Sequence, residues 1–423
     1  MEKNIISLSI FLVSYTLFVF LPNKRTHVSV AGAALLVVTN TISLKDAFFA
    51  VNWNVMGIFV GTLIVADIFM ESRVPAYLAE IIVDKAKNTT WAILLICALT
   101  GFISAFVENV ATVLIVAPIA MALAKKLKLN PVNMMIAIAV TSNLQGTATL
   151  IGDPPSMLLG GFAKMNFMDF FFYKGRPSIF FAVELGALFS FMVLFFIFRA
   201  HKEKAGLIPV EKVKSWTPTV ILISIILLLA TSSFFDTGFS YMAGIICMIG
   251  GAISVIWEKF INKKSITAGL KKLDWETTLF LVGVFVLVGA IMLTGWVESI
   301  SSYLSGLIGT NILLGYILIV LMSVIISAFV DNVPFLVAML PVTVSVSSKL
   351  AIDPSLFLFG LLIGASIGGN ITPIGASANI VACGILKKEG HEVKFGQFMK
   401  IGIPFTLAAV TAACIFIWFV WSK

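Results

Sequence analysis

The sequence predicts an all-α membrane protein with many spans, because its composition, its long apolar runs and an internal repeat agree. Of the 423 residues, 59% are hydrophobic and 12% are charged, and the mean hydropathy is +1.05. These values lie outside the range of soluble domains. Several apolar runs reach the roughly 20 residues that a helix needs to cross a bilayer, and a helix satisfies its own backbone hydrogen bonds there. We therefore expect a polytopic bundle of helices.

Ten segments are predicted to cross the membrane, and the fourth and ninth of them are interrupted. They are 5–21, 27–42, 53–71, 132–162, 175–199, 216–232, 238–257, 275–294, 355–386 and 399–421. Two further apolar pairs, 91–125 and 311–349, each contain one polar break, so each is either two crossings or one re-entrant hairpin; we favour the hairpin. Most of the 29 Lys and Arg residues then fall in loops on one side, which predicts an inner-membrane protein with both termini outside. The net charge of +8 thus reflects topology and not nucleic-acid binding.

Residues 326–379 repeat residues 103–156 without a gap, so that Ile103 matches Ile326, and further upstream Trp53 and Gly61 resemble Trp275 and Gly283. Ile103–Val110 returns almost unchanged as Ile326–Val333, and 15 positions are identical when 103–156 is aligned with its copy. The repeat divides the chain into 1–200, a cytoplasmic linker at 201–215, and 216–423. Five crossings per half is an odd number, so the second copy enters the membrane from the opposite side. Inverted repeats of this kind are typical of alternating-access transporters, whose site lies where the repeats meet.

The break in each hairpin carries polar residues in the middle of an apolar run. They are Ser104, Glu108 and Asn109 in the first copy and Ser327, Asp331 and Asn332 in the second. An acid inside the membrane costs about 2.5–3.5 kcal/mol, so it normally faces a water-filled cavity or a partner. The spacing of four residues predicts that each Ser shares a helical face with its acid. Capping of the following helix is the alternative role, and it is compatible with ion binding.

Gly and Pro interrupt the two broken helices, 132–162 and 355–386, and irregular backbone at that depth is tolerated only beside protein or a cavity. Polar and small residues at these breaks are expected to line the cavity: Ser142, Asn143, Gly146, Thr147, Thr149, Gly369, Asn370, Thr372, Ser377 and Asn379. Asp153 precedes Pro154 and is expected to cap a helix, with proton transfer as its alternative role. Asp67 and Glu184 lie inside predicted spans, where they carry protons, make polar helix–helix contacts or lie at the membrane interface.

Motifs for other functions are absent from the sequence. The four cysteines are scattered through apolar segments, and the three histidines lie in loops far apart, so we expect neither a metal site nor a cofactor. No HExxH or GxSxG motif is present, so we expect no enzyme activity. Residues 73–85 and the segment around 297–307 are predicted to be amphipathic helices at the membrane interface.

At the hairpin breaks and at the strings Thr147–Ser156 and Gly369–Asn379, the sequence resembles the ion transporter superfamily. It is most similar to the branch of arsenite efflux permeases, NhaD-type sodium/proton antiporters and the pink-eyed-dilution transporters, and more distantly to the sodium/dicarboxylate symporters. The resemblance implies a scaffold domain, a moving transport domain and a homodimer that works as an elevator. It also implies two half-sites: Ser104, Glu108 and Asn109 with Gly146–Thr147, and Ser327, Asp331 and Asn332 with Gly369–Asn370.

From this resemblance we expect secondary transport of an inorganic ion or metalloid. The preferred function is efflux of arsenite or antimonite driven by proton entry, with Glu108 or Asp331 exchanging the proton. A soluble ATPase subunit would be a partner if the chain is an arsenite pump. Sodium/proton antiport is the alternative, followed by an anion channel or an anion/dicarboxylate symporter. The dicarboxylate alternative is weakened because symporters of that group carry Ser-Asn-Thr where this chain has Glu-Asn-Val and Asp-Asn-Val.

Overall fold

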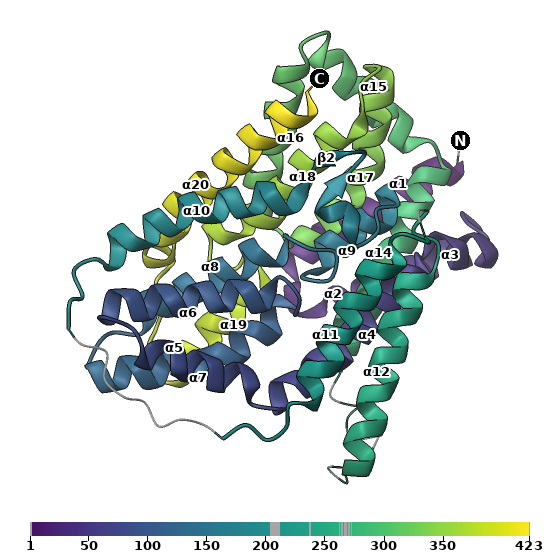
Figure 1. Cartoon of the computed structure of the whole chain (residues 1–423). Coiled ribbons are helices and arrows are strands. Elements are labelled where there is room, and N and C mark those ends of the chain that lie inside the picture. The colour runs from purple at the N-terminus through teal and green to yellow at the C-terminus, as the bar shows by residue number, and fades with distance from the viewer. Residues whose placement is uncertain are drawn as a thin grey trace.

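The computed structural model describes residues 2–203, 212–236, 238–261, 263, 265, 269, 271 and 273–422. Within these ranges the protein is almost entirely helical, with a single pair of two-residue strands (Figure 1). Eight helices are long and apolar enough to cross a membrane, and the shorter helices at 25–38, 89–104, 217–232 and 312–327 are also apolar. The chain is therefore a multi-pass membrane protein, as predicted. The central part of the predicted linker, 204–211, lies outside the described residues.

One set of helices, here called the scaffold group, lies on the right of Figure 1. Its members are α1 (Glu2–Phe20), α2 (Arg25–Val38), α3 (Leu44–Ala50), α4 (Trp53–Glu71), α11 (Thr217–Ser232), α12 (Met242–Ile261) and α14 (Trp275–Leu293), with the short turn η1 (Pro22–Lys24) before α2. Helix α4 packs on α12, and α14 packs on α2. Glycine permits both contacts: a Cβ added to Gly61 would lie 2.7 Å from the backbone N of Met248, and one added to Gly283 would lie 2.6 Å from the backbone C of Ser29.

The remaining helices form the hairpin group. In the first half they are α5 (Val74–Asp84), α6 (Thr89–Ser104), α7 (Asn109–Leu127), α8 (Val132–Gly146), α9 (Pro154–Ala163), η2 (Met168–Phe170) and α10 (Ile179–Phe198); in the second, α15 (Trp296–Ile308), α16 (Ile312–Ser327), α17 (Asn332–Lys349), α18 (Pro354–Gly368), η3 (Gly369–Ile371), α19 (Ser377–Lys388) and α20 (Phe395–Trp421). Helices α10 and α20 pack along each other, as Figure 1 shows. The strands β1 (Phe172–Tyr173) and β2 (Arg176–Pro177) form a small antiparallel hairpin before α10.

The sequence repeat is reproduced in the hydrogen bonds of the hairpin group. Two bonds from a hydroxyl to a backbone carbonyl occur in both copies, and the repeat offset relates all four of the residues in each copy. They are Ser104 to Ser142 and Thr149 to Ala105 in the first copy, and Ser327 to Ala365 and Thr372 to Ala328 in the second. Each bond ties the break of a helical hairpin to the broken helix beside it. The two halves therefore share one local architecture, as the sequence predicts.

Most predicted elements are confirmed, and three details are corrected. Helices α6 and α16 end at Ser104 and Ser327, so the chain has left the helix before Glu108 and Asp331; the expected shared helical face is wrong. The span expected from residue 175 begins only at Ile179, because the β1–β2 hairpin occupies the preceding residues. Helix α3 was not expected; it starts with a capping box between Ser43 and Asp46.

Candidate functional site

A cavity of about 400 Å³ lies between the scaffold group and the hairpin group. The scaffold group contributes side chains from α2, α4 and the start of α14, and the hairpin group contributes both hairpin breaks and parts of the two broken helices. The polar residues in its lining are Arg25, Asp67, Glu108, Asn109, Asn143, Asp274, Thr277, Asp331, Asn332 and Ser377. The sequence predicts six of these as site residues, namely Glu108, Asn109, Asn143, Asp331, Asn332 and Ser377, and names Asp67 as a candidate proton carrier.

The break of the first hairpin places a carboxylate at the start of a helix. Glu108 is the N-cap of α7, and its side chain accepts a hydrogen bond of 3.0 Å from the backbone N–H of Ala111. Capping and cavity lining, the two roles expected as alternatives, thus occur together. The structure shows no ion pair of Glu108 with any described residue. Its neighbour Asn109 is buried and points toward α8.

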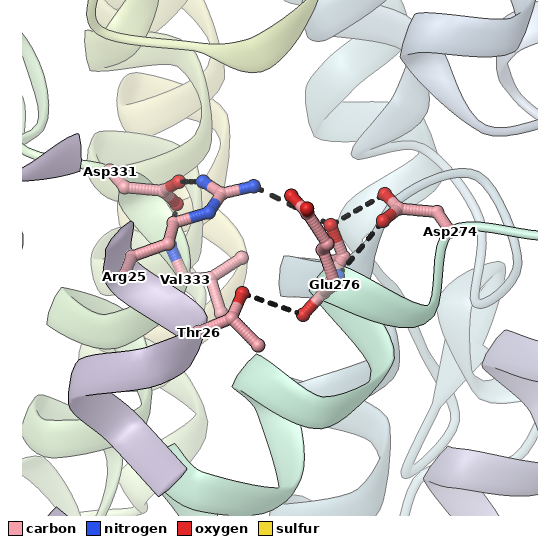
Figure 2. Close-up of polar contacts among 7 residues, drawn as sticks. Arg25, Thr26, Asp274, Glu276, Asp331 and Val333 are labelled. Atoms are coloured by element: carbon pink, nitrogen blue, oxygen red, sulfur yellow. Dashed lines mark hydrogen bonds and ion pairs between the residues drawn. The ribbon is translucent and has the colours of Figure 1, made fainter. Parts of the chain in front are cut away.

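At the break of the second hairpin an acid again caps the following helix, but here a cation lies beside it. Asp331 caps α17 by accepting a hydrogen bond of 3.0 Å from the N–H of Val333. It also forms an ion pair with Arg25, the first residue of α2 in the scaffold group (Figure 2). The Asn332 side chain lines the cavity and makes no hydrogen bond to a described residue, whereas its repeat equivalent Asn109 bonds to Asn143.

Four asparagines connect the two halves of the hairpin group. The Asn109 amide donates to Asn143 Oδ1 at 3.2 Å, and the Asn143 amide donates at 2.9 Å to Oδ1 of both Asn370 and Asn379. The amides of Asn370 and Asn379 in turn donate to backbone carbonyls, including Val140 O at 3.0 Å. All four residues are buried. This network fixes both broken helices against each other, which explains why a polar core is stable at this position.

Six other predicted residues of the hairpin breaks and the broken helices are buried outside the cavity lining. Ser104, Ser142, Thr147, Thr149, Ser327 and Thr372 all have 0% exposure, and none belongs to the cavity lining. Gly146 leaves room for the Asn109 side chain, and Gly369 allows the backbone of Gly375 to approach closely. The hydroxyls and the glycines hold the breaks in shape, so their contribution to a site is positional. Ser377 is different, because it lines the cavity at the first residue of α19.

The additional acids lie in three different environments. Asp67 on α4 lines the cavity. Asp153 is 1% exposed and caps α9 by accepting a hydrogen bond of 2.9 Å from the N–H of Ser156, as expected. Glu184 on α10 lies outside the cavity lining and contacts Gln145 of α8. Among the described residues no group of three or more His, Cys, Asp or Glu side chains is arranged to hold a metal ion.

Sequence reasoning named Asp67 of the scaffold group but missed the polar residues that α2 and α14 contribute. Asp274 is the exposed N-cap of α14 and bonds at 2.6 Å to Thr277 Oγ1, and both line the cavity. Arg25 was interpreted only as a loop charge that marks the cytoplasmic side. The sequence offered one indication, namely that Arg25 starts a helix next to an apolar span. Many Lys and Arg residues that only mark the cytoplasmic side share this position. The cavity thus contains the carboxylates of four acids and one guanidinium.

A second cavity of about 400 Å³ lies between α3, α9, α17 and the other end of α14. Many residues that line it correspond, by the sequence repeat, to residues that line the first cavity. Some of these pairs are shifted by one position from the alignment of Ile103 with Ile326. The matched positions, first cavity to second, include Leu63 to Phe285, Leu114 to Val337, Asp274 to Asn52, and Val381 to Leu158. The second cavity is nearly free of charge, with Asp46 as the sole ionisable residue among its described lining residues.

Comparison with known proteins gives matches over nearly the whole chain. The model of the CitMHS family, described as citrate transporter, matches residues 15–353 and 314–423. An uncharacterized transporter of Mycobacterium bovis is 26% identical over 424 residues, which cover 98% of each chain. The P protein of Mus musculus is 26% identical over 485 residues, covering 94% of this chain and 58% of the P protein.

The fold also matches a solved transporter. The crystal structure of the YdaH transporter of Alcanivorax borkumensis superposes with a TM-score of 0.65 and covers 99% of this chain and 98% of that chain. The sequence identity is 13%, so this likeness concerns the fold.

Proposed function

Since this chain belongs to the CitMHS family and is a secondary transporter, not an enzyme, we propose that it exchanges a proton or monovalent cation at Glu108 for a small solute bound in the first cavity. Membership confirms the superfamily expected from the hairpin motifs, including its pink-eyed-dilution branch, to which the P protein belongs. The citrate transporter family itself was not named from the sequence.

The observation that supports this proposal is the environment of the Glu108 carboxylate. Its carboxylate lines the cavity at a helix N-terminus and has no ion-pair partner among the described residues. A carboxylate removed from bulk water needs a proton or a cation to offset the cost of burial. Asp274 in the same cavity adds negative charge and favours such a cation further. Glu108 is therefore the group that binds the coupling ion.

For the solute we propose arsenite or antimonite, moved outward as the coupling proton enters. Such a solute is a small neutral trihydroxide at neutral pH, so it needs hydrogen-bonding groups more than charge. Asn332 and Ser377 line the cavity with side chains that make no hydrogen bond to a described residue. None of the four cysteines belongs to the lining, so the proposed recognition uses hydroxyl and amide groups and not thiols.

Two other solutes are favoured by particular observations. Arg25 in the cavity and the description of the matched family favour a carboxylate such as citrate. The surplus of acids over cations in the lining favours sodium/proton antiport, in which Glu108 binds either ion.

We further propose that the hairpin group moves against the scaffold group as an elevator, in a homodimer in the inner membrane.

The proposal is tested with purified protein in liposomes that have an acidic interior and contain a pH-sensitive dye. Arsenite, antimonite, sodium, lithium and citrate are added separately. We expect arsenite or antimonite to collapse the proton gradient, and Glu108→Gln to reduce that rate at least 10-fold. Glu389→Gln is the matched control, because Glu389 is exposed at the end of α19 and lies outside the cavity lining.

Each result assigns the solute or rejects the mechanism. Collapse by sodium or lithium alone would identify a cation antiporter and would show that the metalloid assignment is wrong. Collapse by citrate alone would assign a carboxylate. An unchanged rate in Glu108→Gln for every active solute would contradict the proposed role of Glu108.

A further inference from the structure

The two hairpin breaks are equivalent by sequence and backbone but differ in their positive charge. Glu108 and Asp331 occupy equivalent positions of the repeat, and each caps the helix that follows. Asp331 is paired with Arg25, while Glu108 has no ion-pair partner among the described residues. The repeat thus provides two carboxylate positions, and the chain supplies its own cation to one of them.

Several contacts hold the Arg25 guanidinium at the second break, as Figure 2 shows in part. Besides the Asp331 carboxylate, it approaches Thr277 Oγ1 at 3.5 Å and lies 5.1 Å from the centre of the Phe280 ring. Thr277 is itself fixed by Asp274 at 2.6 Å. The side chains of Arg25 and Asp331 are only 28% and 25% exposed. A half-buried pair of this kind is oriented by its surroundings, unlike a surface ion pair.

The pair joins the two groups of helices. Arg25 begins α2 of the scaffold group, whereas Asp331 caps the helix after the second hairpin break. Other charged groups in the same cavity are Asp67 from α4, Glu108 at the start of α7 and Asp274 at the start of α14, and all three are acids. Arg25 is therefore the sole cationic side chain among the described lining residues. Removal of its charge would leave Asp331 among three other carboxylates.

We propose that Arg25 is a tethered cation that occupies, at Asp331, the position that a proton or monovalent cation takes at Glu108, so that this conformation has one open coupling site and not two. The inference rests on the proposed function of Glu108. It implies that Arg25 sets the number of coupling ions. It also implies that any movement of the hairpin group away from the scaffold group must separate Arg25 from Asp331, and that a second proton or cation then neutralises Asp331.

The test measures ion binding without a transported solute. The full chain is purified in detergent, and its Tm is followed while sodium replaces choline at constant ionic strength, and separately as the pH is lowered. Arg25→Met opens the second position, so we expect an additional saturable rise in Tm of about 2 °C or more with sodium or with protons. That added rise is expected to disappear in Arg25→Met/Asp331→Asn.

Two control variants separate charge from shape. Arg25→Lys keeps a cation on the same helix and is expected to retain the wild-type response. Lys24→Met removes an exposed charge from the preceding residue, outside the first cavity, and is also expected to behave as wild type.

The outcomes distinguish this inference from the proposed function. An Arg25→Met response identical to that of the wild type, or an added response that survives Asp331→Asn, overturns the inference. If Arg25→Met does not fold, the double variant must recover wild-type stability, since it removes both charges, and a failure to recover also overturns it. A wild-type protein with no response to sodium or protons contradicts the role of Glu108 instead.

Discussion

At the scale of single residues, Asn143 is the asparagine that contacts the other three members of the network. Its side chain accepts from Asn109 and donates to both Asn370 and Asn379. Asn143→Ala removes the acceptor of the Asn109 amide and the donor to the Oδ1 atoms of Asn370 and Asn379, and each buried polar group left unpaired costs about 1–3 kcal/mol. We expect a lower Tm and a loss of most transport in liposomes. Asn133→Ala, at an exposed position of the same helix, is expected to change neither; equal effects of both substitutions would contradict the network's role.

The pH dependence of stability can be predicted for an ion pair outside the membrane spans. Burial alone would raise the pKa of Asp353, but hydrogen bonds from Lys174 at 2.7 Å and from Ser355 outweigh it and lower the pKa. A lowered pKa stabilises the fold above the ordinary pKa of an aspartate, and this stabilisation is lost as the pH falls through the native pKa. Both side chains are more than 40% exposed, so the contribution is at most about 1 kcal/mol.

Asp353→Asn tests this contribution, because asparagine keeps the N-cap of α18 and loses the charge. We expect the variant to have a slightly lower Tm than the wild type at pH 7. The difference should shrink toward zero as the pH falls below about 4. A constant difference across this range would show that the carboxylate charge does not contribute.

At the scale of elements, the scaffold group depends on how closely α4 approaches α12. A Cβ at Gly61 would lie 2.7 Å from the backbone N of Met248, closer than real Cβ contacts, so Gly61→Ala must force the helices apart at a cost of about 1–3 kcal/mol. Gly306 in α15 has no atom within 4 Å of its added Cβ. Gly306→Ala is expected to raise stability by about 0.5–1 kcal/mol through helix propensity. Thermal unfolding of both variants should therefore give shifts of opposite sign.

Most of the helices could be predicted from the sequence, but only some of the residues of the candidate site could. Apolar run lengths and the repeat located the hairpins and broken helices because both signals are local or periodic. Asp274 and Arg25 could not be found in this way, since the role of Arg25 arises from packing against Thr277 and Asp331, which lie far away along the chain. Ser104 was predicted to belong to the site and Thr149 to line a cavity, but the hydroxyls of both bond to backbone carbonyls, which composition does not reveal.

At the scale of the whole molecule, the two cavities allow a test of the inverted arrangement. Leu63 and Phe285 are equivalent by the repeat and line the first and second cavity, respectively. In a background with the four native cysteines replaced by alanine, Leu63→Cys and Phe285→Cys are exposed to a membrane-impermeant thiol reagent. We expect labelling from opposite sides of the membrane, because an inverted repeat places equivalent positions at opposite depths. Labelling of both from the same side would contradict the inverted topology.

The asparagine network also has an evolutionary consequence. Its members come from both halves, and three of them have different residues as repeat equivalents: Asn143 corresponds to Ser366, Asn370 to Thr147, and Asn379 to Ser156. The Ser366 hydroxyl has no hydrogen-bond partner among the described residues, so the network is not mirrored. Two identical half-proteins would carry the same residue at each pair of positions, so they could not place Asn at one position of a pair and Ser or Thr at the other. The asymmetry of the present polar core therefore reflects divergence of the two copies of the repeat.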